Sequence, residues 1–456
     1  MKRLALRPAG WGVLAALMLL ANVPRLLVPA LLARPGQVFV GEFWNSFDLP
    51  QYVEAIHEGS TGRWLYGGRL WGATVDGNYP FQVEYLAVGH LLAGWNSLAV
   101  LEVMRWGCQI FAVCSALLLI CAVFRDSNER AWALFFGTIA GGLGWLALGW
   151  PSTPLGQVIP MDVVTPSFNL LDAFIGSPHL ALMGGCMAVY GWGFVEATRG
   201  HRKGLAGLAG LALALDIHPF EIVAIVSAAA LIAVLMVRTP TALAFVGASL
   251  LLSGLVAGYL VWLAGHDSIF AALTASSLTT EVGNVPSFLV ARGPVVVPAV
   301  AALWVARRHL DPVIAFLAAW AGLATVLNLQ PFDPAGALHR SLEGASLAFG
   351  CLAALGMHSI SIRWRPLLAG ICLVSPMFQV VALLMTVGGE PVDWVPTAVF
   401  QLASEPATQR TNGCVSGDVI DIRWLAAESN LCLANAGQAD FKLVLSRGRA
   451  TLKRAG

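Results

Sequence analysis

The sequence predicts an all-α fold, a polytopic bundle of transmembrane helices, and two observations lead to that prediction. Hydrophobic residues make up 57% of the 456 residues, and the mean hydropathy is +0.72. Apolar runs of about 17 to 25 residues recur along the chain, each long enough to cross a bilayer as a helix. The net charge of +1 argues against nucleic acid as a partner.

We expect about eleven spans from the lengths of these runs. They lie near residues 11–32, 98–124, 131–150, 179–197, 204–217, 219–237, 241–265, 288–306, 312–330, 342–362 and 366–388. Pro219 separates two short spans, because proline breaks a helix. The segment 81–97 is too short to cross the bilayer comfortably and is expected to form a helix at the membrane surface.

Basic residues divide the loops into two sets and predict the orientation. One set of short loops holds most of the Lys and Arg residues, whereas the longer loops hold only Arg34, Arg63, Arg69 and Arg340. Cytoplasmic loops carry the excess of positive charge in membrane proteins. The N-terminus is therefore expected in the cytoplasm. The loops expected outside are 33–97, 151–178, 266–287 and 331–341.

The domain organisation follows from this topology. Residues 1–388 form a transmembrane module whose first extracytoplasmic loop is 33–97, and residues 389–456 form a short extracytoplasmic tail. Scarce Lys with abundant Arg, Ala and Gly is typical of a GC-rich bacterial genome, so we expect a multi-pass protein of a bacterial inner membrane. Cys414 and Cys432 would then face an oxidising compartment, which favours a disulfide over two free thiols.

A polar and aromatic segment from Gly41 to Tyr85 interrupts the apolar chain. It contains four of the six tyrosines. Such aromatics can form an interfacial belt at the headgroup level, or a platform on which sugar rings stack while carboxylates hold hydroxyl groups. The second interpretation assigns substrate contacts to Glu54, Trp64, Tyr79 and Glu84, with Asp48 and Asp76 nearby.

Asp48 itself has two interpretations. The first interpretation is a capped amphipathic helix. It has Asp48 as N-cap, Pro50 in the first turn, Gln51 at the third helical position and Gly59 past the end. The same carboxylate at a membrane surface can act as a general base that takes a proton from an incoming hydroxyl. Both can hold, because a carboxylate fixed at a helix start is well positioned.

Several cations fall near the outer ends of the predicted spans. They are Arg25, Arg105, Arg292 and Arg340, the last preceded by His339. Arginine within a membrane protein is usually paired or functional, and its guanidinium can hold a lipid phosphate through two N–H groups. The alternative for each side chain is snorkelling to the headgroups.

Two histidines lie beside helix ends. His218 lies with Asp216 and Glu221 around the proline break, where polar satisfaction of a broken helix is the simpler explanation. His179 starts another span, and a lone histidine is more often structural. The sequence has no HExxH or CxxC metal spacing. It also has no Walker, GxGxxG or GxSxG motif, so ATP-driven and serine-hydrolase chemistry lack support.

The order of these features resembles the GT-C superfamily of integral-membrane glycosyltransferases. One span is followed by a long outer loop with an acid before a surface helix, and many spans follow. More narrowly, the chain is similar to uncharacterised bacterial and archaeal members up to about residue 350. The motifs are Asp48…Tyr52, Gly62-Arg63-Trp64-Leu65, Tyr79-Pro80-Phe81, Gly89-His90, Gly141-Gly142-Leu143-Gly144-Trp145, Ser177-Pro178-His179, His218-Pro219-Phe220 and Arg340-Ser341-Leu342-Glu343-Gly344.

The resemblance implies an inverting transfer of a sugar from a polyprenyl-phosphate donor, bound from the outer leaflet. The acceptor would be a hydroxyl of a glycan, lipid or protein. Asp48 would be the base and Arg340 would hold the lipid phosphate, helped by His339, Arg292 and Arg105. On the same interpretation, His179 and His218 contact substrate.

One departure from the superfamily bears on metal use. Many members have two adjacent acids, or acid-x-acid, in the first outer loop, whereas Leu49-Pro50 follows Asp48 here. No cofactor is therefore assigned, and a requirement for a divalent metal ion, like activity itself, is left open. The competing hypothesis is a non-enzymatic transporter or lipid-handling protein on a similar scaffold, which would place paired charges near mid-bilayer.

Overall fold

The computed structural model describes most of the chain, and its residues divide into two compact units. The described residues are 6–41, 48–68, 70, 79, 81–147, 152–153, 156–157, 162, 168–267, 271, 284–329, 344–386, 394–409, 413–416, 419–429, 431–433, 439–446 and 449–454. Unit 1 comprises Met1–Asn22, Cys108–Phe174 and Leu180–Val381, and unit 2 comprises Val23–Gly107, Ile175–His179 and Ala382–Gly456.

Four long helices contribute residues to both units. They are α1 (Pro8–Leu31), α4 (Ser97–Val123), α9 (Pro178–Thr198) and α17 (Arg365–Thr386). The other helices of unit 1 are α5 (Ser127–Thr138), α6 (Gly144–Ala147), α8 (Leu170–Ile175), α10 (Gly207–Ile217), α11 (Ile222–Ile232), α12 (Pro240–His266), α14 (Val285–Ala306), α15 (Pro312–Leu329) and α16 (Ser346–Gly356). Short helical turns η3 (Arg202–Ala206), η4 (Ala233–Val237) and η6 (Met357–Ser359) and the hairpin of β2 (Ser152–Thr153) and β3 (Gly156–Gln157) complete it.

Seven helices among the described residues are long and apolar enough to cross a membrane: α1, α4, α9, α12, α14, α15 and most of α17. These seven coincide with predicted spans. The segments Ile222–Val237 and Ser346–Ser359 are apolar but shorter. The predicted spans 131–150 and 204–217 correspond to α5 and α10, of 12 and 11 residues. At 1.5 Å per residue, neither of those two helices reaches across a bilayer.

Local sequence signals explain where several helices begin. The side chain of Asp126 accepts hydrogen bonds from the first-turn amides of α5, and Thr239 and Asn284 do the same for α12 and α14. Pro240 supplies the fixed backbone angle suited to the first turn of α12. The predicted break at Pro219 is also present, because α10 ends at Ile217 and α11 begins at Ile222.

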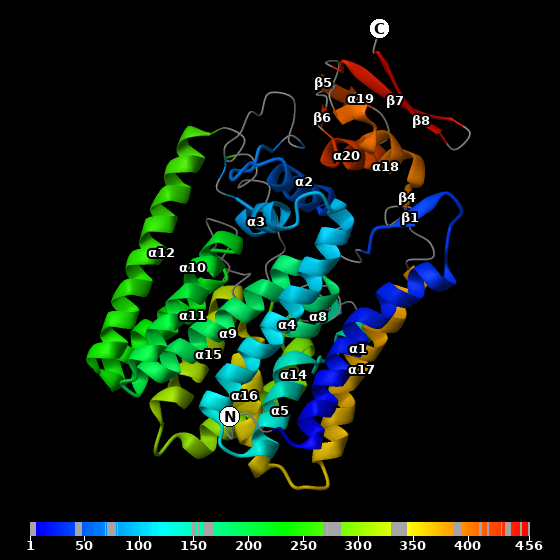
Figure 1. The fold of residues 1–456 in the computed structure, drawn as a ribbon. Coiled ribbons are helices and arrows are strands. Elements are labelled where there is room, and N and C mark those ends of the chain that lie inside the picture. The colour runs from blue at the N-terminus through cyan, green and yellow to red at the C-terminus, as the bar shows by residue number, and fades with distance from the viewer. Residues whose placement is uncertain are drawn as a thin grey trace. The chain divides into compact units, whose positions relative to one another are not determined.

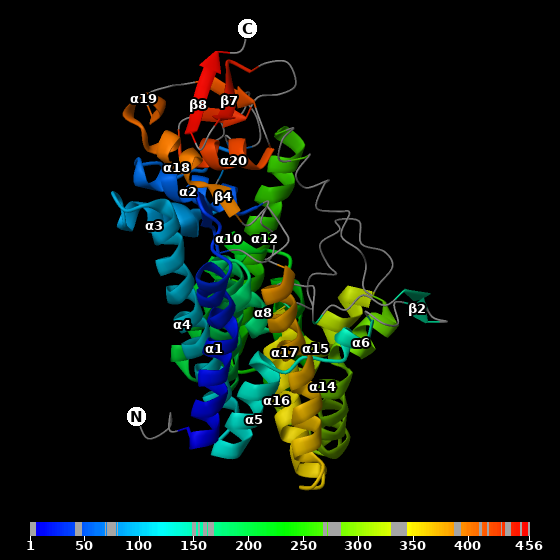
Figure 2. The ribbon, with the colours of Figure 1, turned by 90° about the vertical axis from the view of Figure 1, so that its right-hand side faces the viewer.

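Small residues allow the helices of unit 1 to approach closely. Gly137 of α5 and Gly350 of α16 meet so tightly that a Cβ on Gly350 would lie 2.4 Å from the Gly137 Cα. Such contacts are typical of membrane helices, in which small residues bring backbones together. Helices α5, α14 and α16 lie side by side (Figures 1 and 2). By contrast, only 17% of the apolar window of α12 is buried, as expected for a lipid-facing helix.

Unit 2 combines the first predicted outer loop with the C-terminal segment. Helix α2 (Leu49–Ser60) packs on α3 (Val83–Leu91), which is the predicted surface helix, and on α20 (Val419–Ala427). Strand β1 (Gln37–Phe39) pairs antiparallel with β4 (Trp394–Pro396). Trp394 packs there against Val28 and Phe39. The segment expected as a short tail is therefore folded against the outer loop.

The rest of the C-terminal segment forms a small mixed sheet and two short helices. The elements are α18 (Thr397–Ser404), α19 (Pro406–Gln409), β5 (Gly413–Ser416), β6 (Leu431–Leu433), β7 (Phe441–Ser446) and β8 (Arg449–Arg454). The strand order is β6-β5-β7-β8. Strand β5 runs parallel to both of its neighbours, β6 and β7, whereas β8 runs antiparallel to β7. The β7–β8 hairpin and α20 can be followed in Figures 1 and 2.

Candidate functional site

Asp48 occupies the position before α2 that the sequence predicts, and its side chain is exposed. Pro50 lies in the first turn, as expected. In the described first turn, however, the Asp48 carboxylate makes no capping hydrogen bond, because its backbone is already helical (φ −88°, ψ −22°) rather than extended. Asp48 therefore holds the predicted N-cap position, but the predicted side-chain capping bond is wrong.

Arg423 of α20 is the cation beside this carboxylate. Burial lowers the pKa of the Arg423 guanidinium, and the nearby charges of Asp48 and Glu54, together with Tyr66, oppose that effect. A cation close to a carboxylate favours its ionised form. Asp48, Glu54 and Arg423 therefore interact electrostatically within one cluster.

Glu54 is the fully buried carboxylate of the same cluster. It is 0% exposed on α2, and the hydroxyl of Tyr66 donates a hydrogen bond to its carboxylate. Tyr66 is held in turn by Tyr79, because the amide of each residue donates to the carbonyl of the other, at 2.9 and 3.1 Å. The structure thus brings together two predicted substrate residues, Glu54 and Tyr79, through a tyrosine that bridges them.

Two tyrosine rings, of Tyr52 and Tyr85, pack against His179. The hydroxyl of Tyr85 lies 2.8 Å from Nδ1 of His179. The rings of Tyr52 and Tyr85 stack at 4.9 Å with an interplanar angle of 6°, and Tyr52 also lies 4.9 Å from the histidine ring. Tyr52, Tyr85 and His179 are all buried. In this conformation His179 supports the inner face of α2 and α3.

Trp64 is one of several exposed tryptophans of unit 2, with Trp95 and Trp106. It is 59% exposed, and it stacks on His90 of α3 at 4.0 Å. The His90 ring is fixed by a 2.8 Å hydrogen bond between its Nε2 and the carbonyl of Arg63. An exposed, rigidly held indole face is suited to stacking on the apolar face of a sugar. Glu84, half-buried, lies in the first turn of the same helix.

Arg105 and Arg25 fix the backbone just before α9. Nη1 of Arg105 donates to the carbonyl of Gly176 at 2.8 Å, and Arg25 donates to the carbonyls of Gly41, Ile175 and Gly176. The Glu102 carboxylate lies 3.2 Å from Nε of Arg105. With a side chain that is 1% exposed, Arg105 is engaged in structure in this conformation.

His218 pairs with Glu221 in unit 1, across the proline break. Nδ1 of His218 lies 2.8 Å from Oε1 of Glu221, whose side chain is buried. A Cβ on Gly344 would lie 3.6 Å from the other Glu221 oxygen. Two motifs singled out in the sequence, His218-Pro219-Phe220 and the end of Arg340–Gly344, therefore converge at Glu221. A small cavity lined in part by Glu221, Gly344 and Asn169 lies there.

Arg292 lies in a second cluster of unit 1 and is fully buried. Its guanidinium lies 3.7 Å from the centre of the Phe168 ring and donates to the Phe168 carbonyl. Asp162 and Asp172 act on it electrostatically. Burial raises the pKa of Asp162, and that of Asp172 well above its usual range.

A glycine-rich motif completes the Arg292 cluster. The amides of Gly142 and Gly144 donate to Asp162 at 2.7 and 3.2 Å, and the Ser375 hydroxyl donates at 2.6 Å. A Cβ on Gly142 would lie 2.1 Å from the Ala291 carbonyl oxygen, so only glycine fits. Among described residues, Nε and Nη1 of Arg292 and one oxygen each of Asp162 and Asp172 have no hydrogen-bond partner.

Some predicted residues cannot be placed. Arg340, His339 and Asp76 lie outside the described residues. Within the described part of the chain, no group of three or more His, Cys, Asp or Glu side chains is arranged to hold a metal ion.

Sequence reasoning missed three charged residues of these clusters, Arg423, Asp162 and Asp172. Arg423 lies in the segment treated as a tail, and no local signal connects it to the predicted outer loop. Asp162 and Asp172 were detectable, because they are the two acids of the long loop 151–178.

Neither a protein-family model nor a curated protein sequence matches this chain. Among solved structures, it resembles ArnT from Cupriavidus metallidurans in the apo state, with a TM-score of 0.50, 11% identity and coverage of 93% of this chain and 85% of that chain. ArnT from the same organism bound to undecaprenyl phosphate gives a TM-score of 0.52 and 12% identity, covering 95% and 87%. Because ArnT is a GT-C glycosyltransferase, these likenesses confirm the predicted all-α, GT-C-like membrane fold.

Proposed function

We propose that this protein is a membrane glycosyltransferase that moves a sugar from a polyprenyl-phosphate donor to an acceptor hydroxyl at the extracytoplasmic face. The fold supports this proposal, since one of the similar ArnT structures is bound to undecaprenyl phosphate. The observation that carries it is the exposed carboxylate of Asp48, which does not cap its own helix and lies beside Arg423. A carboxylate released from capping and kept near a cation is suited to proton transfer.

In the proposed step, Asp48 accepts the proton of the acceptor hydroxyl. The acceptor oxygen then forms a bond to the sugar C1, while the bond from C1 to the phosphate oxygen breaks. The electron pair of that bond leaves with the lipid phosphate, so attack from the opposite side inverts the configuration. We assign the phosphate to Arg340 and His339, with Arg292 and Arg105 as further candidates.

The other candidates take three kinds of role in this proposal. Trp64, with its exposed ring, is the candidate for direct stacking on a sugar. Glu54, Tyr79 and His179 are buried in the described conformation and position their neighbours. Glu84 and His218 are only partly buried and remain candidates for hydroxyl contacts.

The test is Asp48→Asn in purified protein, measured in two assays. The first assay records binding of undecaprenyl phosphate, and the second records its release from a panel of undecaprenyl-phosphate-linked pentoses and hexoses. We expect the variant to keep lipid binding and to lose release by about 100-fold or more, the usual contribution of a general base. Asp440→Asn, an exposed acid of the same unit, is the matched control.

Two results would contradict the proposal. Full release by Asp48→Asn would remove the base assignment while leaving the reaction in place. Absence of undecaprenyl phosphate binding and of release by the unaltered protein would argue against the reaction class.

One observation favours a second candidate, a transporter. The Arg292, Asp162 and Asp172 cluster is a buried set of ionisable groups, and such sets within membrane proteins often mark ion or substrate paths. In proteoliposomes containing a pH-sensitive dye, proton movement that Asp172→Asn abolishes and Asp48→Asn leaves intact would favour this candidate over glycosyl transfer.

A further inference from the structure

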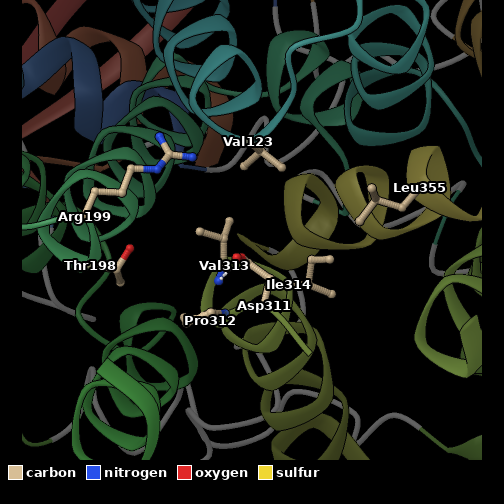
Figure 3. A pocket seen from close by; sticks show the side chains of 8 residues that line it. All are labelled: Val123, Thr198, Arg199, Asp311, Pro312, Val313, Ile314 and Leu355. Carbon is tan, nitrogen blue, oxygen red and sulfur yellow. Dashed lines mark hydrogen bonds between the residues drawn. The ribbon is translucent and has the colours of Figure 1, made fainter. Parts of the chain in front are cut away.

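A second and larger cavity lies in unit 1, and none of its lining residues belongs to the clusters described above. Its volume is about 320 Å³. Figure 3 shows its lining residues: Val123, Thr198, Arg199, Asp311, Pro312, Val313, Ile314 and Leu355. They come from the ends of α4, α9 and α16 and the beginning of α15.

The cavity lies where the three spanning helices α4, α9 and α15 and the shorter apolar helix α16 meet the loops predicted to be cytoplasmic. Nearby loop residues include Arg202, Lys203, Arg307 and Arg308, all exposed. Pockets between membrane helices beside basic loops are places where lipid headgroups bind. The location therefore points to a lipid as the occupant.

Arg199 provides the positive charge of the cavity. Its side chain is 40% exposed. Nη2 donates to the Ala122 carbonyl at 2.7 Å and Nη1 contacts Glu196 at 3.4 Å, and these contacts orient the guanidinium without using all five of its N–H donors. In Figure 3 the guanidinium lies on the opposite side of the cavity from Leu355. A planar guanidinium held in this way suits a phosphate group.

Asp311 provides a negative charge in the same cavity. One of its oxygens accepts the Val313 amide at 2.8 Å and so begins α15, and the side chain is exposed. No ion pair within 4.0 Å joins Asp311 to Arg199, although both are described and both line the cavity. The cavity thus offers one cation, which is ion-paired with Glu196 outside the lining, and one carboxylate that is not paired with it.

We propose that this cavity binds the headgroup of a zwitterionic phospholipid with a primary ammonium group, such as phosphatidylethanolamine. The phosphate lies against Arg199 and the ammonium donates to Asp311. Val123 and Leu355 cover the apolar part of the lipid. A purely anionic headgroup leaves Asp311 opposed to a like charge, and a choline headgroup has no N–H to donate. This proposal is independent of the reaction proposed above.

The test measures the melting temperature of the detergent-purified protein during titration with short-chain lipids. The probes are dihexanoyl phosphatidylethanolamine, phosphatidylcholine and phosphatidylglycerol, and free O-phosphoethanolamine. We expect phosphatidylethanolamine to bind most tightly. Arg199→Gln and Asp311→Asn should each weaken that binding by about tenfold, the value of one charge-assisted hydrogen bond. Asparagine also begins helices well, so Asp311→Asn keeps α15 intact.

Arg363→Gln serves as the matched control, because Arg363 is an exposed cation outside the cavity lining and outside the two loops named above. Retained preference for phosphatidylethanolamine in this variant supports the proposal. Equal binding of phosphatidylglycerol, unaffected by Asp311→Asn, would overturn it in favour of an anion site. Equal stabilisation by free O-phosphoethanolamine would show that the ligand need not be a lipid. Equal stabilisation by all three lipids would show that the cavity is not specific for any headgroup.

Discussion

The hydroxyl of Ser97 donates a hydrogen bond to the carboxyl group of Glu428 across 3.0 Å. Ser97 begins α4, and Glu428 directly follows α20, so this contact joins the C-terminal segment to the first residue of a membrane helix within unit 2. Burial raises the pKa of Glu428 to about 7. The contact is therefore made by a carboxyl that changes charge near neutral pH.

The first prediction concerns the effect of pH on stability. An acid whose pKa is raised from 4.5 to about 7 on folding binds more protons when folded, so stability falls as pH rises between those values. The free energy of unfolding should decrease by about 3 kcal/mol at most across that range. Melting temperatures at pH 5, 6, 7 and 8 should show this slope (~1.4 kcal/mol per pH unit at most). Glu428→Gln should reduce this dependence of stability on pH. An unchanged dependence in that variant would show that other titratable groups cause it.

The second prediction concerns the contact of α2 with α3. A Cβ on Gly89 would lie 2.2 Å from the Ile56 carbonyl oxygen, an atom that cannot move without moving α2. Gly89→Ala should therefore lower stability by about 1 to 3 kcal/mol or more. Gly107→Ala is the matched control, since nothing lies within 4 Å of a Cβ there. Melting curves of both variants provide the measurement, and equal melting temperatures would show that α3 can shift.

Local patterns in the sequence predicted much of the fold. Spans such as those at α1 and α12 follow from apolar length alone, because lipid requires each crossing segment to satisfy its own backbone. The break at Pro219 and the helix starting after Asp48 follow from local backbone chemistry. The short helices α5 and α10 were predicted as spans, and their true ends depend on packing against neighbours that hydropathy does not show.

The site was predicted less completely, for a physical reason. Asp48, Glu54 and Trp64 stand out because polar and aromatic residues are rare in this chain. Their partners Arg423 and Tyr66 are defined by tertiary contact, and no pattern in one sequence connects the first outer loop to α20. The glycines at 142 and 144 were noticed as a motif, but their role in holding Asp162 emerges only from the three-dimensional structure.

The third prediction concerns the buried Glu54. Tyr66→Phe removes the hydroxyl that donates to its carboxylate and leaves a fully buried acceptor less satisfied. Stability should fall by about 1 to 3 kcal/mol. The control is Tyr259→Phe, at a ring of α12 that is 39% exposed. It should change the stability by no more than about 0.5 kcal/mol. Denaturant or thermal unfolding of the two variants gives the comparison, and equal losses would mean that the Tyr66 hydroxyl contributes nothing specific.

The fourth prediction concerns Arg292 and its two carboxyl neighbours. Arg292→Met removes the cation that faces Asp162 and Asp172, and breaking a buried charge cluster in this way costs about 3 to 5 kcal/mol. Asp172→Asn alone should cost little, because burial already raises the pKa of that carboxyl and favours its neutral form. In the double variant the loss should be smaller than the sum of the single losses. Strict additivity in unfolding measurements would show that the two side chains are not coupled.

The last prediction concerns Cys414 and Cys432. The register of the parallel strands β5 and β6 places these two residues directly opposite each other. Neighbouring strands lie about 4.8 Å apart, within the Cα separation that disulfides span. If the predicted extracytoplasmic location is right, the pair should be oxidised. Mass spectrometry of unreduced peptides should then find the two cysteines linked.

Loss of that disulfide should also lower the stability of unit 2. A bridge that closes a loop of this length contributes about 3 kcal/mol by restricting the unfolded chain. Cys414→Ser and Cys432→Ser should therefore have the same effect as each other, and no further effect when combined, because either one removes the same bridge. Cys114→Ser, at an exposed thiol of α4, is the control. Alkylation of both tail cysteines in unreduced protein would instead favour two free thiols, and would count against an oxidising location for the C-terminal segment.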